Sequence, residues 1–475
     1  MVALFAAFAV LILGFFVYGR TVERVFAPDD RETPAVAIHD GVDCVPMKKW
    51  KAFLIQFLNI AGTGPIFGAL MGAQFGPVVF LWIVFGSVLG GAVHDYLSGM
   101  ISCRHGGQSI AELSGTYLGK AARMFLRVFS LLLLLLIGTV FVTSPAALLT
   151  RLTPEWMGNN FWVAVILFYY ILATLLPIDK VIGRFYPVFG GILLFMAAGI
   201  LASLLFGGWE LPEFTLANLH PDGEPVWPYM FITVACGAIS GFHATQSPMA
   251  AKCITSEKDG RTVFYGAMIC EAVVALVWAA AGVAFYGTTQ ALHDALAAEG
   301  QAGAVYDISM SMLGRLGGVL AVIGVIACPI TSGDTAFRSA RLILAEWTGL
   351  DQRSIRKRLW ITLPLLGAGA LLTQLDFNSL WRYSSWSNQT LAMVSLWVAA
   401  SYLLRNGRKK TVSLIAALPA TFMSAVSSTY ILMAPEGLRL PAALGYSLGG
   451  AFAALCFAWY LYKLLARRSG SPRAN

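Results

Sequence analysis

The segment NIAGTGPIFGA, residues 59–69, lies inside an apolar stretch long enough to cross a membrane. Gly62, Gly64 and Pro65 each weaken a helix, so a spanning helix is expected to break there. A break frees backbone N–H and C=O groups, and in hydrocarbon each group costs several kcal/mol unless protein, water or a ligand satisfies it. The segment therefore predicts a buried cavity near the middle of the membrane.

The composition of the 475 residues predicts a multi-pass membrane protein. Hydrophobic residues make up 57% of the chain and charged residues 12%, whereas soluble domains carry about 25% charged residues. The seven cysteines form no CxxC pair, and we expect them to be small buried hydrophobic residues rather than disulfides or zinc ligands. The apolar N-terminus lacks a basic region and a cleavage site, so it is interpreted as a retained span.

The apolar runs predict about 13 spans and no separate soluble domain. Their expected limits are 2–19, 52–75, 77–101, 124–149, 160–177, 185–206, 228–248, 262–287, 304–331, 358–375, 379–404, 411–434 and 441–465.

The positions of Lys and Arg give the expected orientation. All 33 of these residues except Arg151, Arg315, Arg382 and Arg439 fall on one side of the predicted membrane. By the positive-inside rule the N-terminus is outside and the C-terminus is cytoplasmic. The net charge of +8 is thus explained by topology, and no nucleic-acid partner is expected. The outer loop 207–227 is either a lid over an entrance or a solvated connector.

A second break is predicted by CGAISGFHATQSP, residues 236–248, which interrupts the seventh predicted span. It lies five spans after the first, and because five is odd, the second unit is inverted relative to the first. Two interrupted helices at corresponding positions of inverted halves are typical of secondary transporters. The predicted organisation has an N-terminal span and loop (1–50), a first repeat (51–206), a second repeat (228–404) and two further spans with an inside tail (405–475).

The two breaks supply the expected substrate site, because half-helix N-termini attract carboxylates. Each motif alone is also consistent with a helix kink or a packing face of small residues. The candidate substrate-binding residues are Gly62, Thr63, Gly64, Pro65, Ser240, Gly241, His243 and Gln246.

A third motif, CPITSGDTAFRSAR (residues 328–341), contains Thr331, Ser332, Asp334 and Thr335. In a five-plus-five fold this helix lies against the first broken helix, so the four side chains are candidates for ion or proton coupling. The alternative is a helix terminus capped by Ser and Asp.

Other ionisable residues are expected near the inner end. His39, Asp40 and Asp43 in the first inside loop and His94 and Asp95 in the third span form a candidate inner gate or network. Three interpretations stay open: an ion-paired clasp, a proton or gating network, and a metal site at His39, Asp43, His94 and Asp95. Glu271 lies within the eighth predicted span with no evident partner in the sequence, so it is either protonated or paired.

These motifs resemble the carbon-starvation protein A family of bacterial inner-membrane transporters. The resemblance covers most of the chain from Asp40 on, through DGVDCVP, FLIQFLNIAGTGPIFGA, GAVHDYLSGM, CGAISGFHATQSP and ITSGDTAFRSAR. It implies uptake of peptides or pyruvate and a LeuT-like fold of two inverted five-helix repeats. The chain departs from the family in having Cys44 where Tyr is usual, and it corresponds to a short form.

Taken together, we expect an all-α polytopic inner-membrane protein with one extra N-terminal and two extra C-terminal spans. The expected function is secondary active import of small carboxylate-bearing nutrients, peptides or pyruvate, by alternating access. The coupling ion is left open between a proton and Na⁺, no resident cofactor is assigned, and a bound divalent metal is retained as an alternative. A metal-cation carrier of the same fold and a passive channel are the rival functions, and the absence of HExxH and GxSxG motifs argues against an enzyme.

Overall fold

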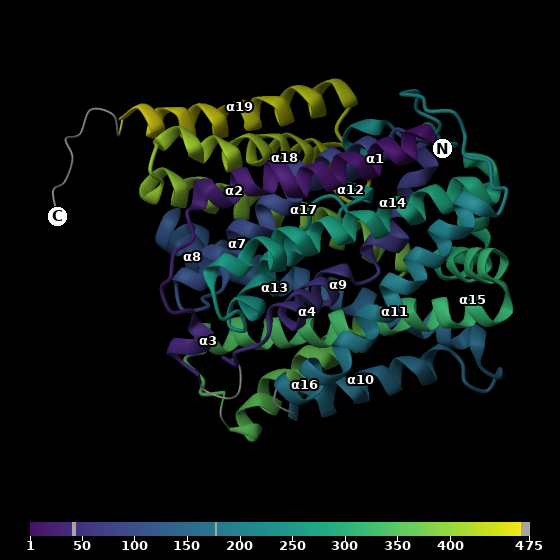
Figure 1. The fold of residues 1–475 in the computed structure, drawn as a ribbon, viewed down its shortest axis with the longest axis horizontal. Helices are drawn as coiled ribbons and strands as arrows, with labels where there is room; N and C mark the ends of the chain where they lie inside the picture. The colour runs from purple at the N-terminus through teal and green to yellow at the C-terminus, as the bar shows by residue number, and fades with distance from the viewer. Residues whose placement is uncertain (40–43, 176–177, 353, 467–475) are drawn as a thin grey trace.

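The computed structural model describes residues 1–39, 44–175, 178–352 and 354–466, with side chains described throughout these ranges except at 178–187. The described residues form helices and connecting loops and contain no β-strand. The helices run side by side along the length of the molecule (Figure 1).

The first half of the chain contains the following elements in order: α1 (Val2–Leu13), η1 (Gly14–Tyr18), α2 (Gly19–Phe26), α3 (Pro34–Ala37), α4 (Lys49–Ala61), η2 (Gly64–Gly68), α5 (Ala69–Gly72), η3 (Ala73–Phe75), α6 (Val79–Leu81), η4 (Trp82–Gly91), α7 (Ala92–Arg104), α8 (Ile110–Tyr117), α9 (Lys120–Leu152), α10 (Asn159–Leu175) and α11 (Ile178–Phe206).

The second half continues with η5 (Val226–Met230), α12 (Phe231–Thr233), α13 (Gly241–Ala251), η6 (Glu257–Asp259), η7 (Arg261–Tyr265), α14 (Gly266–Tyr286), α15 (Thr289–Thr348), α16 (Ile355–Leu372), α17 (Phe377–Asn406), η8 (Lys410–Ser413), α18 (Leu414–Met433) and α19 (Ala442–Ala466).

Within the described ranges, 8 helices are long and apolar enough to cross a membrane, or 9 if the bent pair Lys49–Ala61 and Gly64–Phe75 forms one span. The other predicted spans fall on α10, which is shorter, on the interrupted segment 226–251, and on α16 and α17. The predicted number of about 13 spans is therefore not confirmed, whereas the multi-pass helical architecture is.

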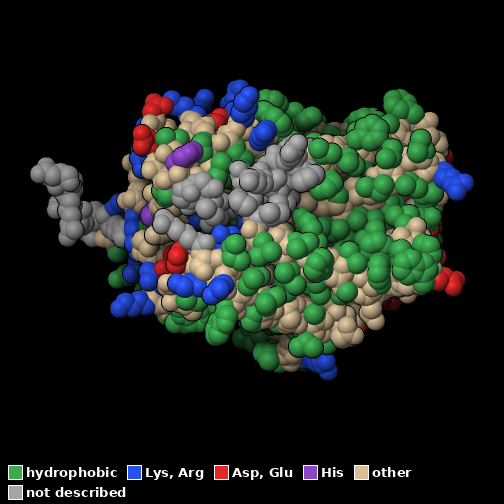
Figure 2. All heavy atoms as spheres, turned by 90° about the horizontal axis from the view of Figure 1, so that it is seen from below, with side chains coloured by type: hydrophobic (Ala, Val, Ile, Leu, Met, Phe, Trp, Pro, Cys, Tyr) green, Lys and Arg blue, Asp and Glu red, His purple; other side chains and the backbone are tan. Residues whose placement is uncertain are grey.

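Charged and hydrophobic side chains occupy different parts of the surface, as is typical of a membrane protein. Figure 2 shows Lys and Arg side chains gathered at one end of the molecule, with hydrophobic side chains covering much of the length beyond it. We call this end the basic end. Exposed Leu448, Leu455 and Trp459 of α19 and Phe5 and Phe16 of the first span contribute to the apolar surface, which suits contact with lipid tails.

The centre of the fold is built where the two interrupted segments cross. A Cβ atom added to Gly64 would lie 2.0 Å from Cβ of Cys236, and one added to Gly237 would lie 2.6 Å from Cβ of Ala275. Gly237 also has φ of +92°, a conformation that residues with a side chain rarely adopt. Glycine at these positions allows the two breaks to touch.

The contact between Gly64 and Cys236 predicts a specific mutational effect. Gly64→Ala should lower stability by about 1–3 kcal/mol because the added methyl group overpacks the crossing. Gly191→Ala is the matched control, since an added Cβ there has no atom within 4 Å. Thermal unfolding in detergent measures both effects, and a Gly64→Ala protein as stable as Gly191→Ala would contradict the packing. Cys236→Gly introduced into Gly64→Ala should recover part of the loss.

Candidate functional site

The first break is a sharp change of direction between α4 and η2. The helix axes before and after the break differ by 55°, and Gly62 has φ of +44°. The carbonyl of Thr63 starts the next half-helix by accepting the N–H groups of Ile66 and Phe67 at 3.1 and 2.8 Å. The hydroxyl of Thr63 is buried and has no hydrogen-bond partner among the described residues. A buried donor of this kind is available to a ligand.

The second break unwinds residues 234–240, and side chains from other helices satisfy its backbone. Trp82 Nε1 donates to the carbonyl of Val234 at 2.9 Å, and Ser87 Oγ donates to the carbonyl of Gly237 at 2.8 Å. Such side chains replace the helical hydrogen bonds that the break removes.

Asn388 of α17 holds the start of the half-helix α13. Its Oδ1 accepts the hydroxyl of Ser240 at 3.0 Å and the N–H of Phe242 at 2.5 Å. Its Nδ2 lies 3.5 Å from Sγ of Cys236. Asn388 therefore caps α13 from another helix. The hydroxyl of Ser240 already donates its hydrogen bond to Asn388, so it is not free to donate to a ligand.

A small cavity of about 20 Å³ lies between the two breaks. Thr63 and Gly64 line it from the first break and Cys236 lines it from the second, while Asn388 and Trp381 close it from α17. This volume holds about one water molecule. Any larger solute therefore needs a side chain at the site to move.

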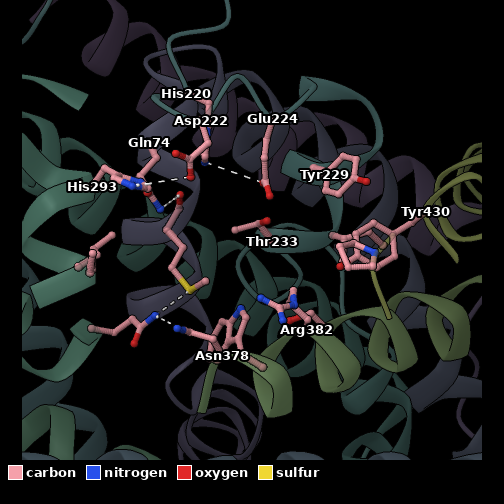
Figure 3. A pocket seen from close by; sticks show the side chains of 18 residues that line it. Gln74, His220, Asp222, Glu224, Tyr229, Thr233, His293, Asn378, Arg382 and Tyr430 are labelled. Atoms are coloured by element: carbon pink, nitrogen blue, oxygen red, sulfur yellow. Dashed lines mark hydrogen bonds and ion pairs between the residues drawn. The ribbon is translucent and has the colours of Figure 1, made fainter. Parts of the chain in front are cut away.

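The loop before η5, which lies at the end of the molecule opposite α3 and α8 (Figure 1), lines a larger cavity of about 330 Å³, which we call the vestibule (Figure 3). Its polar lining comprises Gln74, His220, Asp222, Glu224, Tyr229, Thr233, His293, Gln301, Asn378, Arg382, Ser385 and Tyr430. Trp381 and Ser385 line both the vestibule and the small cavity. The indole of Trp381, whose N–H has no described partner, thus lies at the boundary between them.

The structure distributes the predicted substrate residues over three places. The segment from Gly62 to Pro65 and Ser240 lie at the crossing of the breaks. Gly241 packs on α17, where an added Cβ would lie 2.3 Å from the carbonyl oxygen of Asn388. Gln246 lies further along α13, with Nε2 3.3 Å from Ser339 Oγ of α15. His243 points away from α17 toward α7 and α14, as described below.

The predicted coupling residues Thr331, Ser332, Asp334 and Thr335 are buried in α15. Ser332 Oγ donates to the carbonyl of Leu58 at 2.8 Å, so this part of α15 lies against α4 just before the first break. Asp334 Oδ2 lies 3.8 Å from Arg338 Nη2 and makes no hydrogen bond to a described residue. The positive charges of Arg338 and Arg341 act on this buried carboxylate, and its Oδ2 is open to a cation or proton.

His94 and Asp95 belong to a buried cluster rather than to the basic-end loops. Asp95 Oδ1 lies 2.8 Å from His94 Nδ1, and Asp95 Oδ2 lies 2.8 Å from His243 Nδ1. His243 Nε2 in turn lies 3.3 Å from Glu271 Oε2, which supplies the partner that the sequence left open. His39 is exposed in its loop and no described contact joins it to the cluster, while Asp40 and Asp43 lie outside the described residues.

A different set of residues closes the basic end. Arg104 of α7 donates to both carboxylate oxygens of Glu257 at 2.9 Å. The same guanidinium donates to Tyr402 of α17 at 3.0 Å and to the carbonyl of Ala27 at 2.9 Å. Paired hydrogen bonds from Arg to a carboxylate are strong and geometrically specific. This clasp joins α7, α17, the loop after α2 and the segment after α13.

The predicted outer loop lines the vestibule and packs on the end of the first broken segment. The ring of His220 lies against Phe75, with ring centroids 4.6 Å apart, and the N–H of Leu219 donates to the carbonyl of Phe75 at 3.3 Å. Burial lowers the pKa of His220, the positive charge of His293 acts in the same direction, and Asp222 opposes it. The neutral form of His220 therefore favours the packed loop.

Several side chains at the site were not predicted from the sequence, namely Trp82, Ser87, Arg104, Glu257, Trp381 and Asn388. Each is separated by many residues from the segment it contacts, and none lies in a recognisable motif. The signal available in the sequence was the polar character of the stretch around Asn388, which contrasts with its apolar flanks.

Solved structures share a similar arrangement of helices with this chain. The chain is similar to MhsT in complex with L-phenylalanine, with a TM-score of 0.57 and 13% identity over 88% of this chain and 99% of that one. It is also similar to a mutant of the manganese transporter of Eremococcus coleocola, with a TM-score of 0.53 and 12% identity over 90% and 98% of the two chains. At such low identity these similarities show a shared LeuT-like fold only.

The curated relatives that match the sequence include the following three. An uncharacterized membrane protein of Haemophilus influenzae is 44% identical over 63% of this chain and 95% of its own. The peptide transporter CstA of Bacillus subtilis is 27% identical over 88% of both chains. The pyruvate/proton symporter BtsT of Escherichia coli is 29% identical over 52% of this chain and 43% of its own.

The sequence model of the family described as carbon starvation protein CstA matches residues 1–157 and 147–304. These matches include both interrupted segments and the buried cluster of His94, Asp95, His243 and Glu271. Since they span more than half of the chain, this multi-pass helical membrane protein belongs to the carbon starvation protein CstA family.

Proposed function

We propose that this protein is a secondary active transporter that imports small carboxylate-bearing nutrients, peptides or pyruvate, across the bacterial inner membrane by alternating access. The observation that carries the proposal is the small cavity where the two interrupted helices cross, separated from the vestibule by Trp381. Interrupted helices meeting at mid-membrane are the sites where secondary transporters bind their substrates. The names of the CstA and BtsT relatives support peptides and pyruvate as the substrate classes.

The chemistry of the cavity suits a carboxylate. The half-helix that begins after Thr63 directs its partial positive charge toward the crossing. The hydroxyl of Thr63 and the indole N–H of Trp381 line the same cavity and lack partners among the described residues. A carboxylate that accepted these two hydrogen bonds would satisfy both buried donors.

The two ends of the molecule fit one stage of an alternating-access cycle. With the basic end in the cytoplasm, the vestibule faces outward and the Arg104–Glu257 clasp closes the inner side. Movement of Trp381 would admit substrate from the vestibule, and opening of the clasp would release it inward. A passive channel needs a continuous path, whereas here both barriers are built from specific side chains.

Gradient-driven uptake tests this proposal. Proteoliposomes containing the full chain should accumulate labelled pyruvate or a labelled dipeptide when a proton or Na⁺ gradient is imposed. We propose that Asp334 is the coupling group, so Asp334→Asn should abolish accumulation against a gradient and retain exchange of substrate. Asp307→Asn, in the part of α15 that precedes the kink at Gly314, is the control because this residue is partly exposed. Accumulation by Asp334→Asn equal to wild type would exclude this role for Asp334, and failure of wild type with both substrates and both gradients would overturn the proposal.

Thr63 provides a test of the substrate site. Thr63→Val keeps the shape of the side chain and removes the hydroxyl, so KM for the transported carboxylate should rise about 10- to 100-fold, as expected for one hydrogen bond to a charged group. Thr63→Ser should retain near wild-type KM. Thr362→Val on α16 removes another buried hydroxyl without a described partner and should leave KM unchanged. An equal effect of Thr362→Val and Thr63→Val would mean that the loss is not local to the site.

The outer loop should respond to pH through His220. Its lowered pKa means that the packed loop is stabilised above about pH 6.5 and that this stabilisation is lost as the pH falls, because protonation then favours the released loop. Hydrogen exchange of residues 215–223, corrected for intrinsic rates, should increase from pH 7 to pH 5. His220→Gln should remove this pH dependence, while Lys258→Gln, on the basic-end segment after α13, should preserve it. Unchanged protection of the wild-type loop at pH 5 would contradict the assignment.

A further inference from the structure

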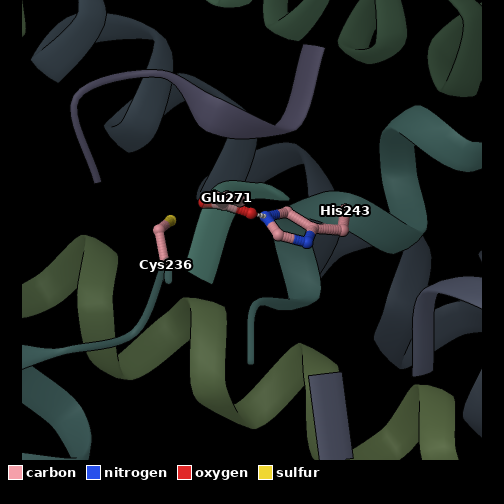
Figure 4. A group of neighbouring side chains, drawn as sticks. All are labelled: Cys236, His243 and Glu271. Atoms are coloured by element: carbon pink, nitrogen blue, oxygen red, sulfur yellow. Dashed lines mark ion pairs between the residues drawn. The ribbon is translucent and has the colours of Figure 1, made fainter. Parts of the chain in front are cut away.

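Three side chains with metal-binding atoms converge at the second break (Figure 4). Cys236 lies in the unwound segment, His243 lies in α13 and Glu271 lies in α14. One ligand atom from each lies within 4.8 Å of the others, and all three residues are buried. None of the three is adjacent to another in the sequence, so the fold itself assembles the group.

The facing atoms of His243 and Glu271 are unusual because neither has a well-formed hydrogen bond. Nε2 of His243 and both carboxylate oxygens of Glu271 lack hydrogen-bond partners among the described residues, although the N–H of Gly237 faces the carboxylate. No Lys or Arg in the described ranges forms an ion pair with Glu271. Among the described residues its ion-pair partner is His243, so a positive charge on that imidazole or on a bound ion must offset the cost of burying the carboxylate.

Asp95 determines which atom His243 presents to Glu271. An ionised carboxylate only accepts hydrogen bonds, so Asp95 fixes the proton of His243 on Nδ1 through the contact of 2.8 Å. Nε2 of His243 then faces Oε2 of Glu271, 3.3 Å away. A nitrogen and a carboxylate oxygen at this separation accommodate a cation between them, either a proton or a metal ion. A carboxylate behind the distal nitrogen of a histidine is the usual support of a metal-bound histidine.

We propose that Cys236, His243 and Glu271 bind one transition-metal cation of the Zn²⁺ class. Thiolate, imidazole and carboxylate are the donors that zinc accepts, with bond lengths of about 2.0–2.3 Å. In a tetrahedral site such bonds place nitrogen and oxygen ligands about 3.3 Å apart, which matches the observed separation of Nε2 and Oε2. A thiolate and a carboxylate also balance the two charges of a divalent ion.

The position of Cys236 suggests what the metal does. Cys236 is on non-helical backbone, so its sulfur can approach the ion without distorting a helix, and it also lines the small cavity between the breaks. The bound ion connects the unwound segment to α14 and leaves a fourth coordination position for water or a ligand. It therefore stabilises the second break in the geometry seen here.

Metal binding by the purified protein tests the inference without measuring transport, so the result is independent of the proposed substrate. Full-length protein, stripped with a chelator, is titrated with ZnCl₂ by calorimetry and with CoCl₂ by absorption spectroscopy. We expect one equivalent of Zn²⁺ and a thiolate-to-cobalt charge-transfer band. Cys236→Ser should remove the band and weaken binding more than 100-fold, and Asp95→Asn should weaken it about 10- to 100-fold, as for other partners of metal-bound histidines.

Cys270→Ser is the matched control, because Cys270 precedes Glu271 in α14 but is not part of the group. This variant should bind Zn²⁺ like wild type and retain the cobalt band. Glu271→Gln should weaken Zn²⁺ binding, and if that variant fails to fold, Cys236→Ser still decides the question because it exchanges one atom. Absence of stoichiometric binding, or binding that is unchanged in Cys236→Ser, would overturn the proposal.

Discussion

The fold depends on one constraint: backbone groups released by a helix break in hydrocarbon must find partners inside the protein. At the second break the partners come from other helical elements, since Trp82 and Ser87 lie in η4 and Asn388 lies in α17. At the first break, α15 contributes through Ser332, which binds the carbonyl of Leu58. These contacts pin the interrupted helices to their neighbours, and the small cavity lies between them. The helices that pin the breaks therefore also define the candidate site.

The same requirement explains what could be predicted from the sequence. Glycine and proline break helices locally, so the positions of both breaks follow from short segments, and their five-span separation indicates an inverted repeat. The partners of the breaks are long-range: Asn388 is 146 residues from Phe242, whose N–H it accepts. A single polar residue in an apolar helix does not reveal which distant backbone group it will contact. The sequence therefore predicts where the two breaks lie, but it does not predict which distant side chains contact them.

The contacts of buried ionisable side chains are also long-range and could not be predicted from the sequence. His94 and Asp95 lie near the inner end of the third predicted span, and their expected place on the same side of the membrane as His39 suggested one network. In the structure α7 instead directs both side chains into the interior, where Asp95 contacts His243 of α13. Glu271 had no visible partner in sequence because that partner, His243, belongs to a different helix. Helix packing therefore decides which ionisable residues contact one another inside a membrane protein, and distance along the sequence does not predict these contacts.

The predicted number of spans was not confirmed for a related reason. Helices packed in the interior, such as α17, need not be continuously apolar, so a criterion based on apolar length does not count them.

The two ends of the molecule differ in the kind of interaction that closes them, and this difference bears on the transport cycle. Arg104, Glu257 and Tyr402 form a charge-assisted clasp with several directional hydrogen bonds. The barrier toward the vestibule is the single ring of Trp381, which packs among the aromatic rings of Phe67 and Phe377. A packed ring can leave its position by changing rotamer, whereas the clasp requires several charge-assisted bonds to break together. The structure is thus expected to open more readily toward the vestibule than toward the basic end.

Opening the basic end costs free energy, and new interactions elsewhere in the protein must compensate for it. In the proposed function, substrate bound at the crossing of the breaks supplies that gain, because it satisfies donors that have no partner among the described residues.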